Sequence, residues 1–128
     1  MSDVPAKVRG FITATLESTD QLRILLLLAN EPHEWEISEI CGKLYLRSDV
    51  VLPAASRLEE RGLLTSSREP RRFRYQPRNA QLKTMAEQIV ALDRERPVTL
   101  LNIIHARPKD IQDFADAFKL RKDQDEED

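Results

Sequence analysis

The most constraining part of the chain is residues 47–78, RSDVVLPAASRLEERGLLTSSREPRRFRYQPR. Its first half places apolar residues at helical spacing. Gly62 then stands where a helix ends, because glycine accepts positive φ at no steric cost. The second half predicts two short strands joined by a tight basic tip at residues 69–71. A helix followed at once by an arginine-rich hairpin is typical of a winged helix-turn-helix.

The hairpin carries five arginines and one glutamate within residues 68–78. Strand alternation would bury Phe73 and Tyr75 on one face and present arginines on the other. Arginine pairs with phosphate oxygens through a planar fork, so such a face suits a nucleic-acid backbone. A solvated basic turn with no ligand is the plainer alternative. The candidate DNA-binding residues of the hairpin are Arg68, Arg71, Arg72 and Arg74.

The helix before the hairpin is the element expected to enter a major groove. Arg57 suits guanine and Ser48 suits phosphate, whereas Asp49 would repel phosphate unless it caps the helix or accepts from cytosine. Because a proline inside a helix loses a hydrogen bond and clashes with the preceding turn, we expect regular helix only from about Pro53. The candidate DNA-binding residues of this helix are Arg47, Ser48, Ser56 and Arg57.

Helical periodicity also marks the segments that precede this region. Residues 4–16 predict a short amphipathic helix, packed on the rest of the chain or on a partner subunit. Ser18 and Gln21 form a capping-box pattern for a central buried helix that runs to about Asn30. A short strand at 34–37 and a second short helix with Ser38 as its N-cap complete the approach to residue 47.

Charge is distributed unevenly along the chain. The formal net charge is −2, but the last six residues, DQDEED, hold five acids. The rest of the chain is therefore net positive, with the excess concentrated in residues 68–78. We expect residues 123–128 to be disordered, because a run of like charges cannot bury enough surface to offset the ordering entropy.

The fold class predicted is mainly α with a small β-hairpin wing, a winged helix-turn-helix with a C-terminal helical extension. The chain divides into an N-terminal amphipathic helix (1–17), the winged domain (18–78), a helical dimerisation region (79–122) and the acidic tail (123–128). Between residues 82 and 92, apolar side chains recur three, four and three apart, as in a coiled-coil seam. That seam could also pack within one chain. The expected dimer contacts are Leu82, Met85, Ile89, Leu92, Phe114 and Phe118.

Other classes of function find no support in the sequence. With three glycines there is no glycine-rich phosphate loop, and no catalytic or metal-binding spacing occurs. We therefore expect no enzyme activity, catalytic residue, metal or cofactor. Cys41, on an apolar helix face, is expected to be an inert buried thiol rather than a redox sensor. No leader or membrane-spanning run is recognisable, so we expect a soluble cytoplasmic protein.

Several segments resemble winged-helix regulators of the PadR and MarR type. LRILLLLANEPHEWEISEICGKL resembles their opening helix, strand and second helix, and VLPAASRLEERGLLTSS resembles the PadR-type recognition helix. RRFRYQP is similar to the second strand of the wing, and the resemblance covers about residues 18–78. Leu52 stands where PadR proteins usually have an aromatic residue. The resemblance implies a groove-facing side at Ser48, Ser56 and Arg57, and a wing with Arg71, Arg72 and Arg74.

Together these features predict a DNA-binding transcriptional regulator, by default a repressor. It would bind double-stranded DNA as a homodimer, with a recognition helix in each major groove and the wings on flanking backbone. One alternative is a winged-helix module that binds a protein partner through Val50-Val51-Leu52. Another is a redox or ligand sensor that works through Cys41 or a pocket. Whether a small-molecule effector exists is left open.

Overall fold

A computed structural model describes residues 4–68 and 71–106. The predictions for Phe114, Phe118 and residues 123–128, and for the tip residues 69 and 70, lie outside the described residues. None of the helices within those ranges is long and apolar enough to cross a membrane. The elements are α1 (Ala6–Thr15), α2 (Thr19–Asn30), β1 (Trp35–Glu36), α3 (Ile37–Leu44), α4 (Ser48–Glu60), β2 (Leu64–Ser67), β3 (Arg72–Tyr75), α5 (Ala80–Glu95) and α6 (Pro97–His105).

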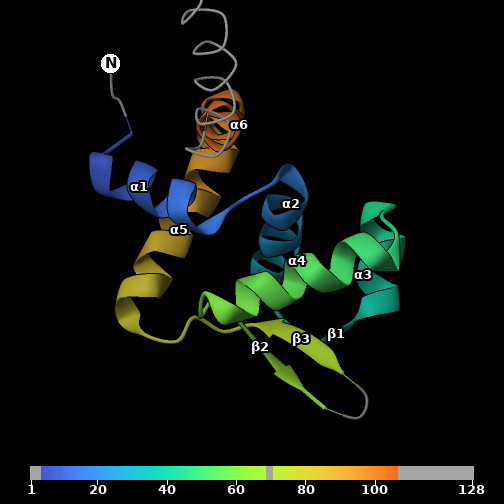
Figure 1. Cartoon of the computed structure of the whole chain (residues 1–128). Helices are drawn as coiled ribbons and strands as arrows, with labels where there is room; N and C mark the ends of the chain where they lie inside the picture. The colour runs from blue at the N-terminus through green and yellow to red at the C-terminus, as the bar shows by residue number, and fades with distance from the viewer. Residues whose placement is uncertain (1–3, 69–70, 107–128) are drawn as a thin grey trace, which may run out of the picture.

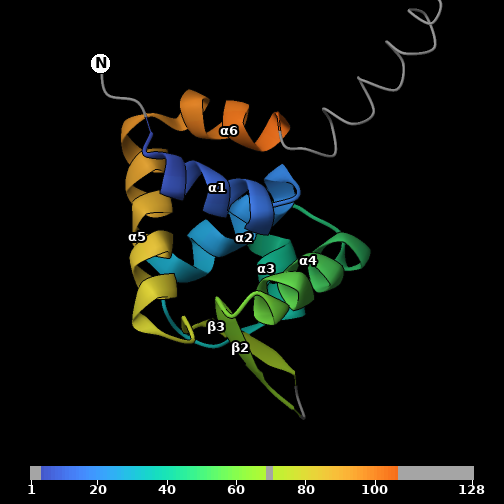
Figure 2. The same ribbon diagram turned by 60° about the vertical axis from the view of Figure 1, so that its left-hand side comes forward.

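The helices form two groups (Figures 1 and 2). α2, α3 and α4 contact one another and stand on a small antiparallel sheet of order β1-β3-β2. α1, α5 and α6 form the second group, in which each helix contacts the other two. The β2–β3 hairpin projects beyond both groups. Three helices followed by a projecting hairpin confirm the predicted winged helix, with α5 and α6 as its extension.

α2 is the central helix, as its apolar run predicted. Ile24, Leu25 and Leu28 are completely buried, and α2 contacts α3, α4 and β3. The Ser18 Oγ accepts from the Gln21 N–H at 3.2 Å, so the expected N-cap is present. The Gln21 side chain reaches one residue further back than a capping box does and accepts from the N–H of Glu17.

The predicted start of α3 is wrong by two residues. The helix begins at Ile37, with Glu36 rather than Ser38 as its N-cap. The Glu39 carboxylate, three residues into the helix, accepts from the Glu36 N–H at 2.8 Å. A reciprocal cap from two glutamates satisfies the first turn, so the exposed Ser38 is not needed there.

The expectation of a loose turn before Pro53 is also wrong. α4 is helical from Ser48, and the N–H of Val51 donates to the Arg47 carbonyl at 3.0 Å. Val51, Ala55 and Leu58 are completely buried on one face, toward α2. A proline inside a helix costs about 3 kcal/mol. Full burial contributes about 1.5–3 kcal/mol for each large aliphatic side chain, so packing of the continuous face outweighs the proline.

Gly62 ends α4 as predicted, with φ at +85°. The Gly62 N–H donates to the Glu59 carbonyl at 2.9 Å, and the Leu63 N–H donates to the Leu58 carbonyl at 3.0 Å. These two bonds are the Schellman pattern, which satisfies the last helical carbonyls and reverses the chain. β2 begins two residues later, so this turn sets the angle between α4 and the wing.

Alternation in the hairpin is confirmed. Phe73 is completely buried and Tyr75 is half-buried, while Arg74 between them is exposed. Phe73 pairs across the sheet with Trp35, whose ring is buried and whose Nε1 donates to the Glu31 carbonyl at 3.0 Å. Trp35 therefore anchors the base of the wing.

The apolar seam of α5 lies largely within the chain. Asn79 caps the helix by accepting from the Leu82 N–H at 2.8 Å, and α5 packs against α1 and α6. Ile89 is completely buried and Met85 is 8% exposed. One chain thus already covers the centre of the seam predicted for dimerisation, which matches the alternative of packing within the chain. Leu82 and Leu92 are half-buried.

Replacement of Gly62 by alanine should lower the free energy of unfolding by about 1–2 kcal/mol, because alanine is strained at positive φ. An added Cβ would also lie 2.9 Å from the Leu82 Cδ1. Gly10→Ala in α1 is the matched control, since a Cβ there meets nothing within 4 Å and alanine favours helix by up to about 1 kcal/mol. Urea titration should show opposite signs for the two variants, and equal signs would contradict this account.

Ile89→Ala should destabilise the single chain by about 2–5 kcal/mol, because it opens a cavity at a completely buried position. Gln88→Ala, at the exposed neighbouring position, should change stability by less than about 0.5 kcal/mol. Unfolding by urea measures both, and sedimentation measures the assembly state. If Ile89→Ala kept full stability and only dissociated a dimer, the seam would instead lie between subunits.

Candidate nucleic-acid interface

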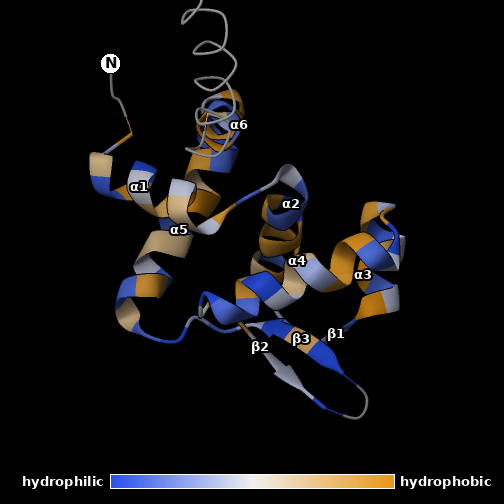
Figure 3. Cartoon of the chain, viewed as in Figure 1, coloured by the Kyte–Doolittle hydropathy of each residue, from blue (hydrophilic) through white to orange (hydrophobic). Residues whose placement is uncertain are grey.

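α4 and the β2–β3 hairpin form one continuous surface. Figure 3 shows hydrophilic residues along β3 and along the end of α4 nearest to it. The buried face of α4 holds the helix on α2, and the Schellman turn leads directly into the wing. The side chains predicted to contact DNA are therefore mounted on elements with fixed relative positions.

The outermost ridge of α4 carries no cation. Helical geometry places Asp49, Pro53, Ser56 and Glu60 opposite the buried residues, at spacings of four, three and four. Two of these four are acids, and Arg57 stands to one side of the ridge. The acids lie at the two ends of this ridge and its middle, Pro53 and Ser56, is uncharged, so basic contacts have to come from the flanks of the helix and from the wing.

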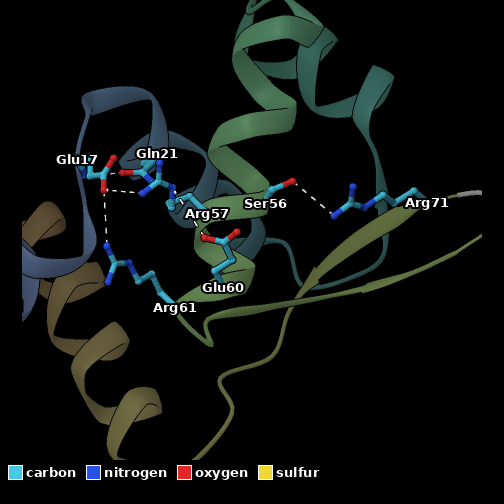
Figure 4. Close-up of polar contacts among 7 residues, drawn as sticks. All are labelled: Glu17, Gln21, Ser56, Arg57, Glu60, Arg61 and Arg71. Atoms are coloured by element: carbon cyan, nitrogen blue, oxygen red, sulfur yellow. Dashed lines mark hydrogen bonds and ion pairs between the residues drawn. The ribbon is translucent and has the colours of Figure 1, made fainter.

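Arg57, the predicted guanine contact, is turned toward the link between α1 and α2 (Figure 4). Its Nη1 lies 3.0 Å from the Glu17 Oε2, and its Nε lies 3.9 Å from the Glu60 Oε1. The Arg61 Nη2 lies 3.6 Å from the same Glu17 oxygen. Half-exposed pairs of this kind contribute about 0–1 kcal/mol, so a phosphate or a base could displace Glu17.

Arg71 and Ser56 were predicted as separate wing and helix residues, and the structure brings them together. The Arg71 Nη2 lies 3.4 Å from the Ser56 Oγ and 3.2 Å from the Glu59 Oε1. The guanidinium also stands 4.7 Å from the centre of the Phe73 ring. The Ser66 Oγ donates to the other Glu59 oxygen at 2.8 Å. Glu59 thus ties both wing strands to α4.

The other wing arginines are of two kinds. Arg72 spans the sheet, with its Nη2 3.1 Å from the Glu36 Oε2 and its Nη1 3.9 Å from the Glu34 Oε1. Arg68 and Arg74 are exposed, and neither forms an ion pair with a residue in 4–68 or 71–106. Arg72 therefore belongs partly to the sheet, whereas Arg68 and Arg74 present their charge to solvent.

Arg47 and Ser48 lie at the start of α4, and both are exposed. The Arg47 Nη2 lies 2.8 Å from the Asp49 Oδ2, and its side chain is 83% exposed. Asp49 is thereby neutralised locally by Arg47 rather than by a helix cap. The predicted residues thus form a cluster of Arg71 with Ser56, and outlying positions at Arg47, Ser48, Arg57, Arg68, Arg72 and Arg74.

Sequence reasoning missed the carboxylates of the site. Glu17, Glu36 and Glu59 hold Arg57, Arg72 and Arg71 respectively. Only Glu59 could have been found from the sequence. Adjacent residues of a helix point to different sides, so Glu59 and Glu60 of R-L-E-E cannot both face the same neighbour. Glu17 and Glu36 come from distant segments, so no local pattern marked them.

Tyr75 sits on the buried side of β3, beside α5. Burial, and after it the carboxylate of Glu87, raise the pKa of the Tyr75 phenol. The group therefore stays neutral to higher pH than usual and adds no charge beneath the wing.

Cys41 is half-buried rather than fully buried. Among the described residues, no three His, Cys, Asp or Glu side chains cluster as metal ligands would.

No protein-family model and no curated protein matches the chain. Two solved structures are similar to it. A transcriptional regulator of the MarR family from Rhodococcus sp. RHA1 has 15% identity and a TM-score of 0.49, covering 88% of this chain and 83% of that one. A MarR family protein from Bacillus stearothermophilus has 21% identity and a TM-score of 0.48, covering 94% and 81%. The winged-helix assignment rests on this chain's own element order and strand register.

Glu59→Ala should loosen the wing, because it removes the carboxylate shared by Arg71 and Ser66. We expect a loss of about 1 kcal/mol in unfolding free energy and faster hydrogen exchange of the β2 and β3 amides. Glu60→Ala removes the same charge one residue away, where the side chain is 73% exposed. Equal exchange rates in the two variants would show that Glu59 does not anchor the hairpin.

Proposed function

We propose that this protein is a DNA-binding transcriptional regulator that uses α4 and the β2–β3 hairpin to hold double-stranded DNA. The observation that carries the proposal is the pair Arg68 and Arg74, exposed on the hairpin with no carboxylate partner among the described residues. A charged side chain is usually either paired with an opposite charge or left in solvent, and these two arginines are left in solvent. Two solvent-facing arginines on a projecting hairpin, Arg68 toward α4 and Arg74 on the opposite face, suit a phosphate backbone.

The dimensions of α4 fit a major groove. Its 13 residues span about 20 Å at 1.5 Å per residue, and the groove is about 12 Å wide. With its inner face fixed on α2, the helix presents Ser56 and the flanking Arg57 to base edges. Ser48, the first residue of the helix, is in line with the buried face and would contact backbone phosphate. The hairpin starts at the end of α4, so its arginines would reach the backbone beside the occupied groove.

Three carboxylates hold arginines of this surface in place before DNA arrives. Glu17, Glu59 and Glu36 would exchange their arginine partners for phosphates on binding. Because such half-exposed ion pairs are weak, breaking them costs little free energy. The pairs also order the arginine side chains before DNA binds. Within α4 there is no Asn or Gln, the residues that read adenine, so we infer that base reading is modest and backbone contact dominates.

We further propose that the protein acts as a cytoplasmic homodimer and represses by occluding the promoter. Partner contacts would come from the α5–α6 side of residues 79–122, where Leu82 and Leu92 are half-buried and Val98 is 68% exposed. Two copies of α4 could then occupy successive major grooves. Ile89 and Met85 would support that face from inside rather than form it.

The protein-interaction alternative loses its proposed surface. Val51 is completely buried toward α2, so Val50-Val51-Leu52 is not a contiguous exposed patch. Leu52 remains 39% exposed. The redox alternative retains a half-buried Cys41 with no second cysteine in the chain.

Salt titration of DNA binding tests the proposal. With Arg68, Arg71, Arg72 and Arg74 on phosphates in each half of a dimer, log affinity should fall against log salt with a slope of roughly −4 to −7. Arg68→Ala with Arg74→Ala should flatten the slope by about 3 and weaken cognate and random DNA about equally. Fluorescence anisotropy with duplex from upstream of the protein's own gene, and with random duplex, measures both effects.

Arg9→Ala is the matched control, because Arg9 is exposed on α1, away from the hairpin (Figure 2). It removes one positive charge without touching the surface and should leave the slope within about one unit of the wild type. If the wild-type protein shows no salt-sensitive affinity for either duplex, the DNA proposal is refuted. A protein-binding function would then have to use a surface other than Val50-Val51-Leu52.

A further inference from the structure

Tyr45, between α3 and α4, holds a backbone conformation that tyrosine rarely adopts. Its φ is 58° and its ψ is 45°, and it is the one non-glycine residue with positive φ in the described part of the chain. Glycine or asparagine is the usual residue at such a helix end. For a side chain with a Cβ the left-handed region is strained, so tyrosine here works against stability.

The surrounding backbone imposes this conformation without help from the tyrosine ring. The N–H groups of Tyr45 and Leu46 both donate to the Cys41 carbonyl, the latter at 3.2 Å. The Arg23 Nη2 donates to the Leu44 carbonyl at 2.7 Å, which ties the turn to α2. Leu46 packs against the core. A glycine at position 45 would keep every one of these contacts and relieve the strain.

The ring of Tyr45 also adds no burial to the fold. It is 91% exposed, the most exposed of the large hydrophobic side chains in the described residues. A strained residue that contributes nothing to packing is more often found at a functional site than elsewhere. Tyrosine combines a flat apolar ring with a hydroxyl donor at low conformational entropy, which suits an intermolecular contact.

The position of Tyr45 points to the DNA backbone as the partner. It lies just before the N-terminal end of α4, between two exposed cations, Lys43 and Arg47. Each forms an exposed ion pair, with Glu31 and Asp49 respectively, that a phosphate could displace. Arg57 and Arg61 lie toward the other end of the helix, about 15 and 21 Å from Arg47 along its axis. Both ends of α4 therefore carry cations, Arg47 beside Asp49 and Arg57 beside Glu60, whereas the ridge between them carries none. The cations are far enough apart to reach the two strands that border a major groove.

We propose that Tyr45 is a DNA-positioning residue, which rests on the function proposed above. Its hydroxyl donates to a phosphate on the strand at the N-terminal end of α4, and its ring lies against the adjacent deoxyribose. Arg47 pairs with the same stretch of backbone. Tyr45 thereby fixes how far α4 advances along the groove, while the wing holds the other side.

Two variants of the full chain test this role. Tyr45→Gly should raise Tm by about 2–5 °C, because the strain is removed, and should weaken DNA binding roughly tenfold. Tyr45→Phe keeps the ring and the strain, so Tm should be unchanged and binding should weaken about threefold through loss of the hydroxyl. Since Tyr45 is neutral, both variants should keep the salt slope of the wild type, whereas Arg47→Ala should flatten it.

The outcomes separate this inference from the proposed function. If the wild type binds duplex DNA with a steep salt slope and Tyr45→Gly binds equally well, the positioning role is refuted and the DNA function stands. If the wild type shows no salt-sensitive binding, the DNA function itself fails. A lower Tm for Tyr45→Gly would refute the claim that tyrosine is kept at the expense of stability.

Discussion

The structure depends on the burial of one face of α4 against α2. Val51, Ala55 and Leu58 are completely buried where α4 contacts the central helix. This packing keeps the helix regular through Pro53 despite the lost hydrogen bond. It also decides which side chains α4 presents to solvent, and through the turn at Gly62 it sets the direction of the wing.

Charge on the exposed surface is arranged as exchangeable pairs rather than as a bare basic patch. Glu17, Glu36 and Glu59 come from three different segments and each holds an arginine of the proposed interface. Such pairs add little stability in water, but they order long side chains before a ligand arrives. A net charge of −2 is therefore compatible with phosphate binding, because the local cations are poised and only partly neutralised.

The two positive-φ residues that flank α4 show opposite solutions to the same problem. Gly62, at the C-terminal end, accepts φ of +85° without strain and leaves room for Leu82 and Arg78. Tyr45, before the N-terminal end, accepts φ of 58° with strain and with its ring in solvent. Gly62 serves the fold. Tyr45 is strained and adds no packing, which indicates a role in binding rather than in folding.

The sequence by itself determined the features that depend on neighbouring residues. The cap at Ser18, the helix end at Gly62 and the alternation around Phe73 follow from local hydrogen bonding, φ preference and strand period, and all are present. Only the tertiary structure decided what covers Ile89, which carboxylate pairs with Arg57, and whether α4 stays helical on both sides of Pro53. Those outcomes depend on contacts between segments far apart in the chain, whose burial energy exceeds the local preferences that sequence patterns report.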